Sequence, residues 1–330
     1  MKQLLVVLVL AGVCRGQSRL GTYNVDPAAL SVSGLSSGAA FATQFQVAHS
    51  EEVMGVGLLA GAPYYCAKGN LMTAVDACMK YPQSINLSNL HLYTQQSVKS
   101  GTVDPVCNMA SARVFIFSGT KDTVVVPGVV KKLEEYYRAY VAAPGAIATV
   151  YDIPAHHGFP TDRYGGACGS PNSDYINNCN YNAAYELLEH IYGGLQKPPT
   201  SHVAQGQLTL FDQAEFFKLA PAPTYGMDTA GYVYVPPPCH IGARCRLHIA
   251  FHGCLQQRGI LADRYAKTTG YNEVADLNNL IILYPQAKKT LTNPNGCWDW
   301  WGYSSYAYAT KNGYQVTGVH RMIRRVLGTY

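Results

Sequence analysis

The segment Gly34-Leu35-Ser36-Ser37-Gly38 has the residue types and the spacing of a nucleophilic serine site. In a G-x-S-x-G turn between a strand and a helix, the central serine is held in a strained backbone conformation at the edge of a sheet. The β-prone run 30–33 leads into this turn, and the helix-compatible run 39–45 leads out of it. This context predicts that Ser36 is a nucleophile, the alternative being an ordinary turn rich in Gly and Ser.

A serine hydroxyl is a weak nucleophile, so it needs a histidine base that is itself oriented by a carboxylate. Asp122 lies just after the strand-like run 113–117. Aspartates in turns are usually caps, but the order serine, aspartate, histidine is that of α/β-hydrolases. The competitors Asp104 and Asp162 do not follow a strong strand so closely. We therefore predict that Asp122 is the orienting acid.

Two adjacent histidines, His156 and His157, follow the next strand-like run, at 148–153. The catalytic loops of an α/β-hydrolase each follow a strand, so either histidine could reach Ser36. The residue pattern alone does not choose between them: one is the base and the other a loop residue.

The oxyanion hole of such an enzyme needs two backbone N–H donors. One is the N–H of Ser37, and in ordinary α/β-hydrolases the other comes from an HG-type loop upstream of the serine. Too few residues precede Ser36 for that half of the sheet, and an HG loop, His252-Gly253-Cys254, lies far downstream. This order predicts a circular permutation, in which residues 205–330 supply the first half of the sheet and residues 17–200 the second.

Strands alternate with helices along the chain, which predicts an α/β fold with a mostly parallel sheet flanked by helices on both faces. We expect strands at 30–33, 53–60, 113–117, 148–153, 207–211, 231–235, 246–251 and 280–284. We expect helices at 39–45, 71–80, 87–99, 128–141, 183–192, 260–278 and 317–327, with a loop at 165–182. Residues 17–330 are expected to form one catalytic domain, with the permutation junction near 197–205.

The N-terminus has the pattern of a secretory signal peptide over residues 1–16. Lys2 supplies a positive charge, residues 4–13 are apolar, and small residues precede a cleavage site before Gln17. Ten apolar residues are too few to span a bilayer, and no later segment has 18 uninterrupted apolar residues. We expect a secreted, extracellular protein without stable membrane insertion.

Charged residues make up 14% of the chain, and its net charge of +5 is scattered. Scattered positive charge is weak evidence for a nucleic-acid partner, and we expect none. We also expect a monomer. The Asn86-Leu87-Ser88 sequon makes Asn86 a candidate N-glycosylation site if the source is a eukaryote.

Ten cysteines agree with an oxidising compartment, and removal of Cys14 with the leader leaves nine. Proximity in the sequence suggests the pairs Cys66–Cys78, Cys168–Cys179, Cys239–Cys245 and Cys254–Cys297. This connectivity is one of several possible, and it leaves Cys107 unpaired. No CxxC pair or HExxH helix supports the alternative of a zinc site, so we expect no metal and no organic cofactor.

Six motifs make the chain resemble a known family. They are Ser33-Gly34-Leu35-Ser36-Ser37-Gly38, Ala60-Gly61-Ala62-Pro63-Tyr64-Tyr65-Cys66, Gly119-Thr120-Lys121-Asp122-Thr123-Val124, His157-Gly158-Phe159-Pro160-Thr161, Phe251-His252-Gly253-Cys254 and Asn295-Gly296-Cys297-Trp298-Asp299-Trp300-Trp301-Gly302. Over nearly all of its mature length the chain resembles the single-domain, circularly permuted extracellular poly(3-hydroxybutyrate) depolymerases and their esterase relatives.

The resemblance implies a serine esterase with Ser36 as nucleophile, Asp122 as acid and His157, rather than His156, as base. It also implies that Ser37 and Cys254 supply the oxyanion N–H groups, and it supports the Cys254–Cys297 pair. The implied substrate is poly(3-hydroxybutyrate) or a related short-chain polyester.

The aromatic segment after Cys297 could form an apolar face for such a polyester or could plug the core. Its candidate substrate-binding residues are Trp298, Trp300, Trp301 and Tyr303. The rival functions are a feruloyl, acetyl-polysaccharide or other small-ester esterase, a non-catalytic secreted binding protein on a hydrolase fold, and a peptidase.

Overall fold

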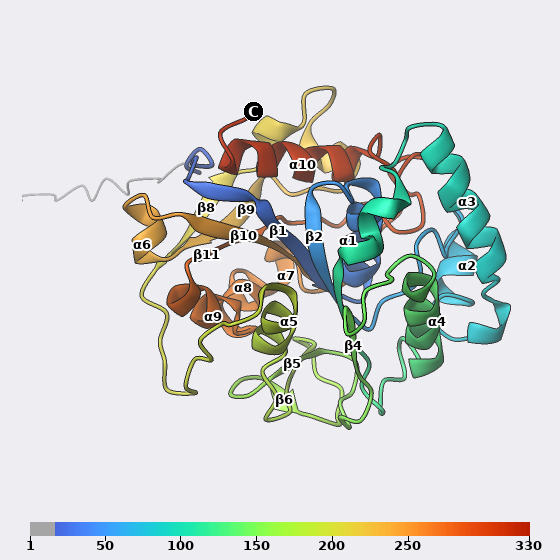
Figure 1. The fold of residues 1–330 in the computed structure, drawn as a ribbon, viewed down its shortest axis with the longest axis horizontal. Helices are drawn as coiled ribbons and strands as arrows, with labels where there is room; N and C mark the ends of the chain where they lie inside the picture. The colour runs from blue at the N-terminus through green and yellow to red at the C-terminus, as the bar shows by residue number, and fades with distance from the viewer. Residues whose placement is uncertain (1–16) are drawn as a thin grey trace, which may run out of the picture.

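An eight-stranded sheet runs through the middle of the protein in the order β4-β3-β2-β1-β10-β11-β9-β8 (Figure 1). The computed structural model describes residues 17–330, so the proposed leader at 1–16 lies outside the described residues. The strands are β1 (Val25–Leu35), β2 (Val53–Leu59), β3 (Arg113–Phe117), β4 (Ile147–Val150), β8 (Gln207–Asp212), β9 (Ala230–Val235), β10 (Cys245–Phe251) and β11 (Leu280–Tyr284).

Strand β1 lies in the centre of the sheet, between strands that are far from one another in the sequence. It pairs in parallel with β2 on one side and with β10 on the other, so that Ser33 lies between Gly57 and Ala250. The six strands from β4 to β11 are parallel. β9 pairs antiparallel with β11, and β8 at the edge pairs antiparallel with β9. The C-terminal strands therefore form the half of the sheet that the sequence order requires them to supply, and the expected fold class is confirmed.

Helices cover both faces of the sheet. The α-helices are α1 (Ser37–Ala48), α2 (Leu71–Val75), α3 (Leu87–Lys99), α4 (Pro127–Arg138), α5 (Ala183–Tyr192), α6 (Pro237–His240), α7 (Arg258–Leu261), α8 (Arg264–Thr268), α9 (Tyr271–Asn278) and α10 (Tyr314–Val326). Short 3-10 helices lie at Pro82–Ser84, Val106–Ser111, Ala214–Phe216 and Ala222–Tyr225.

The side chains of β1 show which helices cover which face of the sheet, because successive residues of a strand point to opposite sides. Ser31 bonds to Tyr192 of α5 and Ser33 bonds to Tyr271 of α9, so these two helices cover one face. Gly34 points to the other face, where it approaches Gly38 of α1. The central strands are therefore buried from both sides, which explains their continuous apolar runs.

Three predicted elements differ from the structure. The helix expected at 71–80 ends at Val75, and the chain continues as turns up to Lys80. The helix expected at 260–278 is divided into α7, α8 and α9, because Ala262 and Gly270 have positive φ angles of 51° and 88°. The loop expected at 165–182 contributes to a small three-stranded sheet of β5 (Phe159–Thr161), β7 (Ile176–Asn178) and β6 (Gly166–Ala167).

Four disulfides join cysteines of the described chain, and all four predicted pairs are confirmed. They are Cys66–Cys78, Cys168–Cys179, Cys239–Cys245 and Cys254–Cys297. Cys107 is free and exposed, as the predicted connectivity requires. None of the helices formed by residues 17–330 is long and apolar enough to cross a membrane.

Candidate active site

Ser36 occupies the sharp turn between β1 and α1. Its φ of 57° and ψ of −119° lie in a region that residues with a side chain rarely adopt. Its own N–H donates to the carbonyl of Leu59 in β2, and its carbonyl accepts from Ala40 in the first turn of α1. The turn thus has the strained strand–turn–helix geometry of a nucleophile elbow.

The two glycines of the elbow are required by close backbone contacts. A Cβ on Gly34 would lie 2.3 Å from the carbonyl carbon of Gly38. A Cβ on Gly38 would lie 2.4 Å from the carbonyl oxygen of Phe251, at the end of β10. Side chains at these positions would push the helix away from both strands, so the spacing G-x-S-x-G follows from the packing.

His157 and Asp122 form a buried pair beside the elbow. His157 Nδ1 lies 2.7 Å from Asp122 Oδ2, and their side chains are 5% and 2% exposed. The other carboxylate oxygen accepts hydrogen bonds from the N–H groups of Val124 and Val125, at 2.8 and 2.9 Å. Asp122 is thereby held in place, and its contact with Nδ1 leaves Nε2 of His157 for proton transfer.

The alternative candidates for the base and the acid make other contacts. His156 bonds instead to Thr123 Oγ1, at 3.3 Å, and does not line the pocket that contains Ser36 and His157. Asp104 forms an ion pair with Lys311, and Asp162 accepts a hydrogen bond from Asn182. Neither aspartate lines that pocket.

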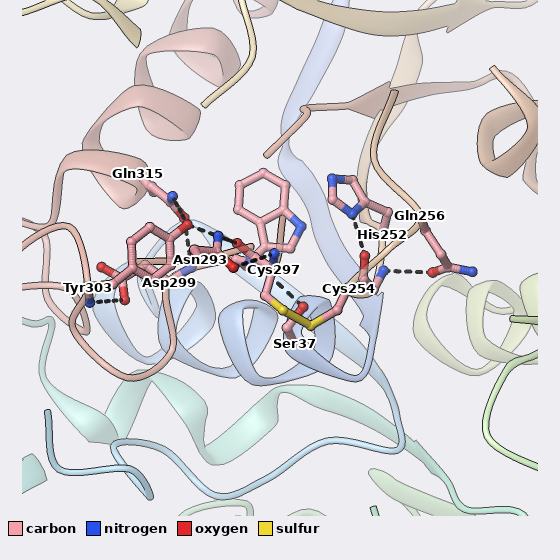
Figure 2. Close-up of a disulfide and its surroundings, with 11 residues drawn as sticks. Ser37, His252, Cys254, Gln256, Asn293, Cys297, Asp299, Tyr303 and Gln315 are labelled. Atoms are coloured by element: carbon pink, nitrogen blue, oxygen red, sulfur yellow. Dashed lines mark hydrogen bonds between the residues drawn. A yellow bond between two sulfur atoms is a disulfide. The ribbon is translucent and has the colours of Figure 1, made fainter. Parts of the chain in front are cut away.

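The HG loop 252–254 lies beside the first turn of α1, and its hydrogen bonds define its conformation (Figure 2). His252 Nδ1 donates to the Gly253 carbonyl at 2.7 Å, and His252 Nε2 accepts from the Ala287 N–H at 3.1 Å. Both ring nitrogens therefore form hydrogen bonds when the ring is neutral and carries its proton on Nδ1. Burial lowers the pKa of His252 from 6.5 to about 4, which keeps the ring neutral at neutral pH.

The Gly253 N–H donates to Gln256 Oε1 at 2.7 Å, so it is not available to a substrate. The amide nitrogen of Gln256 donates to the carbonyls of Asp174 and Tyr175. The Cys254 N–H has no hydrogen-bond partner among residues 17–330. The N–H of Ser37, at the start of α1, has no acceptor within its helix. These two N–H groups therefore remain for an oxyanion.

A pocket of about 340 Å³ opens over the elbow. Its lining comes from the elbow, the Ala60–Ala62 turn, α2, the loops that carry Val124, His157 and Tyr175, the HG loop and the segment 292–301. No Asp, Glu, Lys or Arg is among the described residues that line it. The sequence did not single out the apolar side of this pocket on α2, formed by Leu71 and Val75, because neither residue belongs to a chemically distinctive motif.

The aromatic segment after Cys297 divides into two parts. Trp300 and Trp301 line the pocket. Trp298 does not line it: its side chain is fully buried and stacks on Phe41 of α1, with ring centroids 4.6 Å apart. Tyr303 does not line it either, because its hydroxyl donates to the Cys297 carbonyl at 2.8 Å. Of the four aromatic residues expected to bind substrate, Trp300 and Trp301 therefore line the pocket, and Trp298 and Tyr303 do not.

The Asp299 carboxylate holds the turn that follows the tryptophans (Figure 2). This buried carboxylate accepts from the N–H groups of Gly302, Tyr303 and Ser304, just after Trp301. Burial raises the pKa of Asp299, and these hydrogen bonds oppose that rise.

Comparison with known proteins finds relatives that match nearly the whole chain. A poly(3-hydroxybutyrate) depolymerase from Delftia acidovorans is 40% identical over 310 residues, which are 93% of this chain, but the chain spans only 61% of that enzyme's length. A polyhydroxybutyrate depolymerase from Talaromyces funiculosus is 36% identical over 94% of this chain and 93% of its own. The chain belongs to the PHB depolymerase family.

Further matches extend this family assignment. The family described as "Esterase PHB depolymerase" matches residues 230–327. The crystal structure of a PHB depolymerase from Penicillium funiculosum superposes with a TM-score of 0.85 at 33% identity, over 95% of this chain and all of the other. A serine-to-alanine PHB depolymerase in complex with an R3HB trimer superposes with a TM-score of 0.86, at the same identity and coverage. The two structures share their fold with this chain over nearly its whole length.

Proposed function

We propose that this protein is a secreted serine esterase that hydrolyses the ester bonds of poly(3-hydroxybutyrate) or its oligomers. In the first step, Ser36 Oγ attacks the ester carbonyl while His157 Nε2 takes its proton. Asp122 holds the ring through Nδ1 and stabilises the imidazolium that forms. The N–H groups of Ser37 and Cys254 stabilise the negative charge that develops on the carbonyl oxygen.

The tetrahedral intermediate then collapses, and the alcohol end of the polymer leaves with the proton from His157. Water, deprotonated by His157, attacks the acyl group on Ser36, and the same steps in reverse order release the acid and restore the serine. Each ester is thereby converted into one carboxylic acid and one alcohol. Apart from the attacking water, the chain's own side chains and backbone amides supply the groups that these steps use.

The observation that carries the substrate assignment is the uncharged lining of the pocket around Ser36 and His157. Poly(3-hydroxybutyrate) is a neutral polymer of short ester units with methyl branches. An apolar pocket with few polar groups suits such a chain, whereas a charged substrate would leave its charge without a partner. The relatives of nearly equal length are described as PHB depolymerases, which supports the same substrate.

Degradation of poly(3-hydroxybutyrate) film by the purified protein, followed by the release of soluble hydroxy acid, tests this function. A Ser36→Ala variant is the matched control, because it removes one oxygen atom and leaves the elbow in place. We expect film erosion and hydrolysis of p-nitrophenyl esters by the parent and neither by the variant. Hydrolysis of the soluble esters alone would favour the second candidate, an esterase for small or polysaccharide-linked esters.

The leader predicted at 1–16, the four disulfides and the absence of a membrane-spanning helix within residues 17–330 support secretion. Asn86 is exposed at the start of α3, where its side-chain oxygen accepts from the Asn89 N–H at 3.1 Å. Its amide nitrogen remains available, so a eukaryotic host would glycosylate this residue. Mass spectrometry of the secreted protein tests both points through its N-terminus and its glycan mass.

A further inference from the structure

Two histidines and a glutamate meet on the side of the protein formed by α1 and α10. His49 caps the C-terminal end of α1, Glu52 lies in the turn before β2, and His320 lies in the middle of α10. One possible ligand atom from each of the three lies within 4.8 Å of the others. These residues line no part of the pocket that contains Ser36, so the proposed ester hydrolysis does not use them.

The three side chains are already ordered by one another. His320 Nε2 lies 3.1 and 3.2 Å from the two carboxylate oxygens of Glu52. The rings of His49 and His320 stack with centroids 4.2 Å apart. Ligands of one tetrahedral zinc ion lie roughly 3.3 Å from each other, given Zn–N and Zn–O bonds of about 2.0–2.2 Å. The two stacked rings lie only 16° from parallel, so zinc binding requires the partly exposed His320 ring to rotate out of the stack until both ring lone pairs point at one ion.

His49 carries the second, independent sign of a ligand. The residue is only 5% exposed, and its buried Nε2 has no hydrogen-bond partner among the described residues. A buried polar atom without a partner costs free energy, and such atoms in folded proteins call for an explanation. A neutral imidazole nitrogen without a hydrogen-bond partner has a lone pair available to bind a cation.

The surrounding charges permit a cation here. Glu52 brings a carboxylate to the cluster, where its two oxygens lie within hydrogen-bond distance of His320 Nε2. The last carbonyl groups of α1 give its C-terminal end a partial negative charge, at the position of His49. Two further positive charges act on the cluster: Lys311, which acts on His49 and is paired with Asp104, and Arg324, which acts on Glu52.

The geometry points to a zinc site formed by His49, Glu52 and His320, with its fourth position open to water. Imidazole and carboxylate are ligands that zinc favours, and the set of two histidines and one glutamate is one that it uses in proteins. The site would tie the helix that begins at the elbow serine to the C-terminal helix, across a sequence separation of 268 residues. Its role would be stabilisation of the fold, since bound metal favours the folded state.

Titration of the full mature protein with zinc chloride tests the site, after removal of metal with a chelator. We expect one zinc per chain by calorimetry, a rise in Tm with zinc, and a cobalt(II) complex with the visible spectrum of four-coordinate nitrogen and oxygen ligands. All proteins carry Cys107→Ser, because the exposed thiol could bind zinc by itself. The ligand variants are His320→Gln and Glu52→Gln, which keep the size and polarity of partly exposed side chains.

The matched control is His240→Gln, on the exposed end of α6. We expect zinc affinity to fall by a factor of about 10 or more in both ligand variants and to stay at the parent value in the control. Film hydrolysis and the zinc-free Tm verify that the variants are folded. Equal zinc binding by ligand variants and control would overturn the site, and so would the absence of zinc binding by the parent; the cluster would then be an ion pair with a stacked histidine.

Discussion

Gly38 of α1 packs directly against the carbonyl oxygen of Phe251, where an added Cβ would lie only 2.4 Å away. Phe251 is the last residue of β10, and His252-Gly253-Cys254 follow it. The contact therefore sets the distance between the elbow serine and the proposed oxyanion donor of Cys254. Two segments that are more than 200 residues apart contact each other here through backbone atoms alone. A side chain added at Gly38 therefore cannot be accommodated by the rotation of a neighbouring side chain.

Gly38→Ala is expected to abolish most esterase activity and to destabilise the protein. The new methyl group overlaps backbone atoms that cannot rotate away, and overpacking of this kind costs about 1–3 kcal/mol. Activity on p-nitrophenyl esters and the free energy of unfolding in urea measure the two effects. Gly259→Ala in α7 is the control, because a Cβ there meets nothing within 4 Å. Full activity of Gly38→Ala would show that the contact is not needed.

Asp122→Asn is expected to reduce kcat by a factor of about 10⁴, as loss of the orienting carboxylate does in serine hydrolases. The amide cannot hold His157 in the tautomer that leaves Nε2 free as a base. The Val124 and Val125 N–H groups still find an oxygen acceptor, so the fold should survive. Asp162→Asn, outside the pocket, should retain parent kcat. Comparable losses in both variants would contradict the assignment of Asp122.

Asp122 could be proposed as the acid, and the elbow could be predicted, from the sequence because both depend on local order along the chain. Asp122 follows a strand whose predicted limits, 113–117, are those of β3. A strand buried from both faces has a continuous apolar run with clear ends, so its boundaries can be read directly. The same holds for β11, whose predicted and observed limits are both 280–284.

The sequence could not predict features that depend on tertiary contacts. Trp298 and Trp300 are almost adjacent, yet one stacks in the core and the other lines the pocket. Their surroundings, the ring of Phe41 for Trp298 and the pocket for Trp300, are formed by distant parts of the chain and have no local sequence signature. The helix expected at 71–80 failed for a related reason, since the Cys66–Cys78 disulfide ties its second half into turns.

Acidification is expected to destabilise the fold through His248 and His252, which are fully buried. Burial lowers their pKa values from 6.5 to about 3 and about 4. Between pH 6.5 and 4 the unfolded chain therefore binds protons that the folded chain does not, and stability falls with decreasing pH. Each group contributes a slope of about 1.4 kcal/mol per pH unit within this window. Urea unfolding at several pH values measures the slope.

His248→Phe separates this effect from general acid sensitivity. Ser31 and Ser33 lose the imidazole but keep Tyr192 and Tyr271 as partners. We expect the variant to have a lower free energy of unfolding at pH 8. Between pH 6.5 and 4, its unfolding free energy should depend less steeply on pH, by about 1.4 kcal/mol per pH unit, because one fewer proton is taken up on unfolding. His240→Gln, on the exposed end of α6, should leave the slope unchanged. A parent slope retained in His248→Phe would mean that other groups take up the protons.

Removal of the Cys254–Cys297 disulfide is expected to lower both stability and kcat. The bond closes a sequence separation of 43 residues, so the loop-entropy relation gives about 4 kcal/mol of stabilisation. It also joins the proposed oxyanion loop to the segment that carries Trp300 and Trp301. The double variant Cys254→Ser/Cys297→Ser is compared with Cys239→Ser/Cys245→Ser, whose separation is 6 residues. The second variant should lose stability but keep kcat; equal kcat in both would exclude a catalytic contribution of the Cys254–Cys297 bond.

Replacement of two neighbouring tryptophans should separate stability from substrate binding. Trp298→Ala removes a fully buried ring stacked on Phe41, so we expect a loss of about 3–5 kcal/mol in unfolding free energy. Trp300→Ala removes a ring from the pocket wall and so enlarges the pocket. We expect a raised KM for hydroxybutyrate oligomers and a smaller loss of unfolding free energy than in Trp298→Ala. Steady-state kinetics on oligomers and urea unfolding distinguish the two. A KM change confined to Trp298→Ala would reverse the assignment, because it would place the substrate against the core side of the segment.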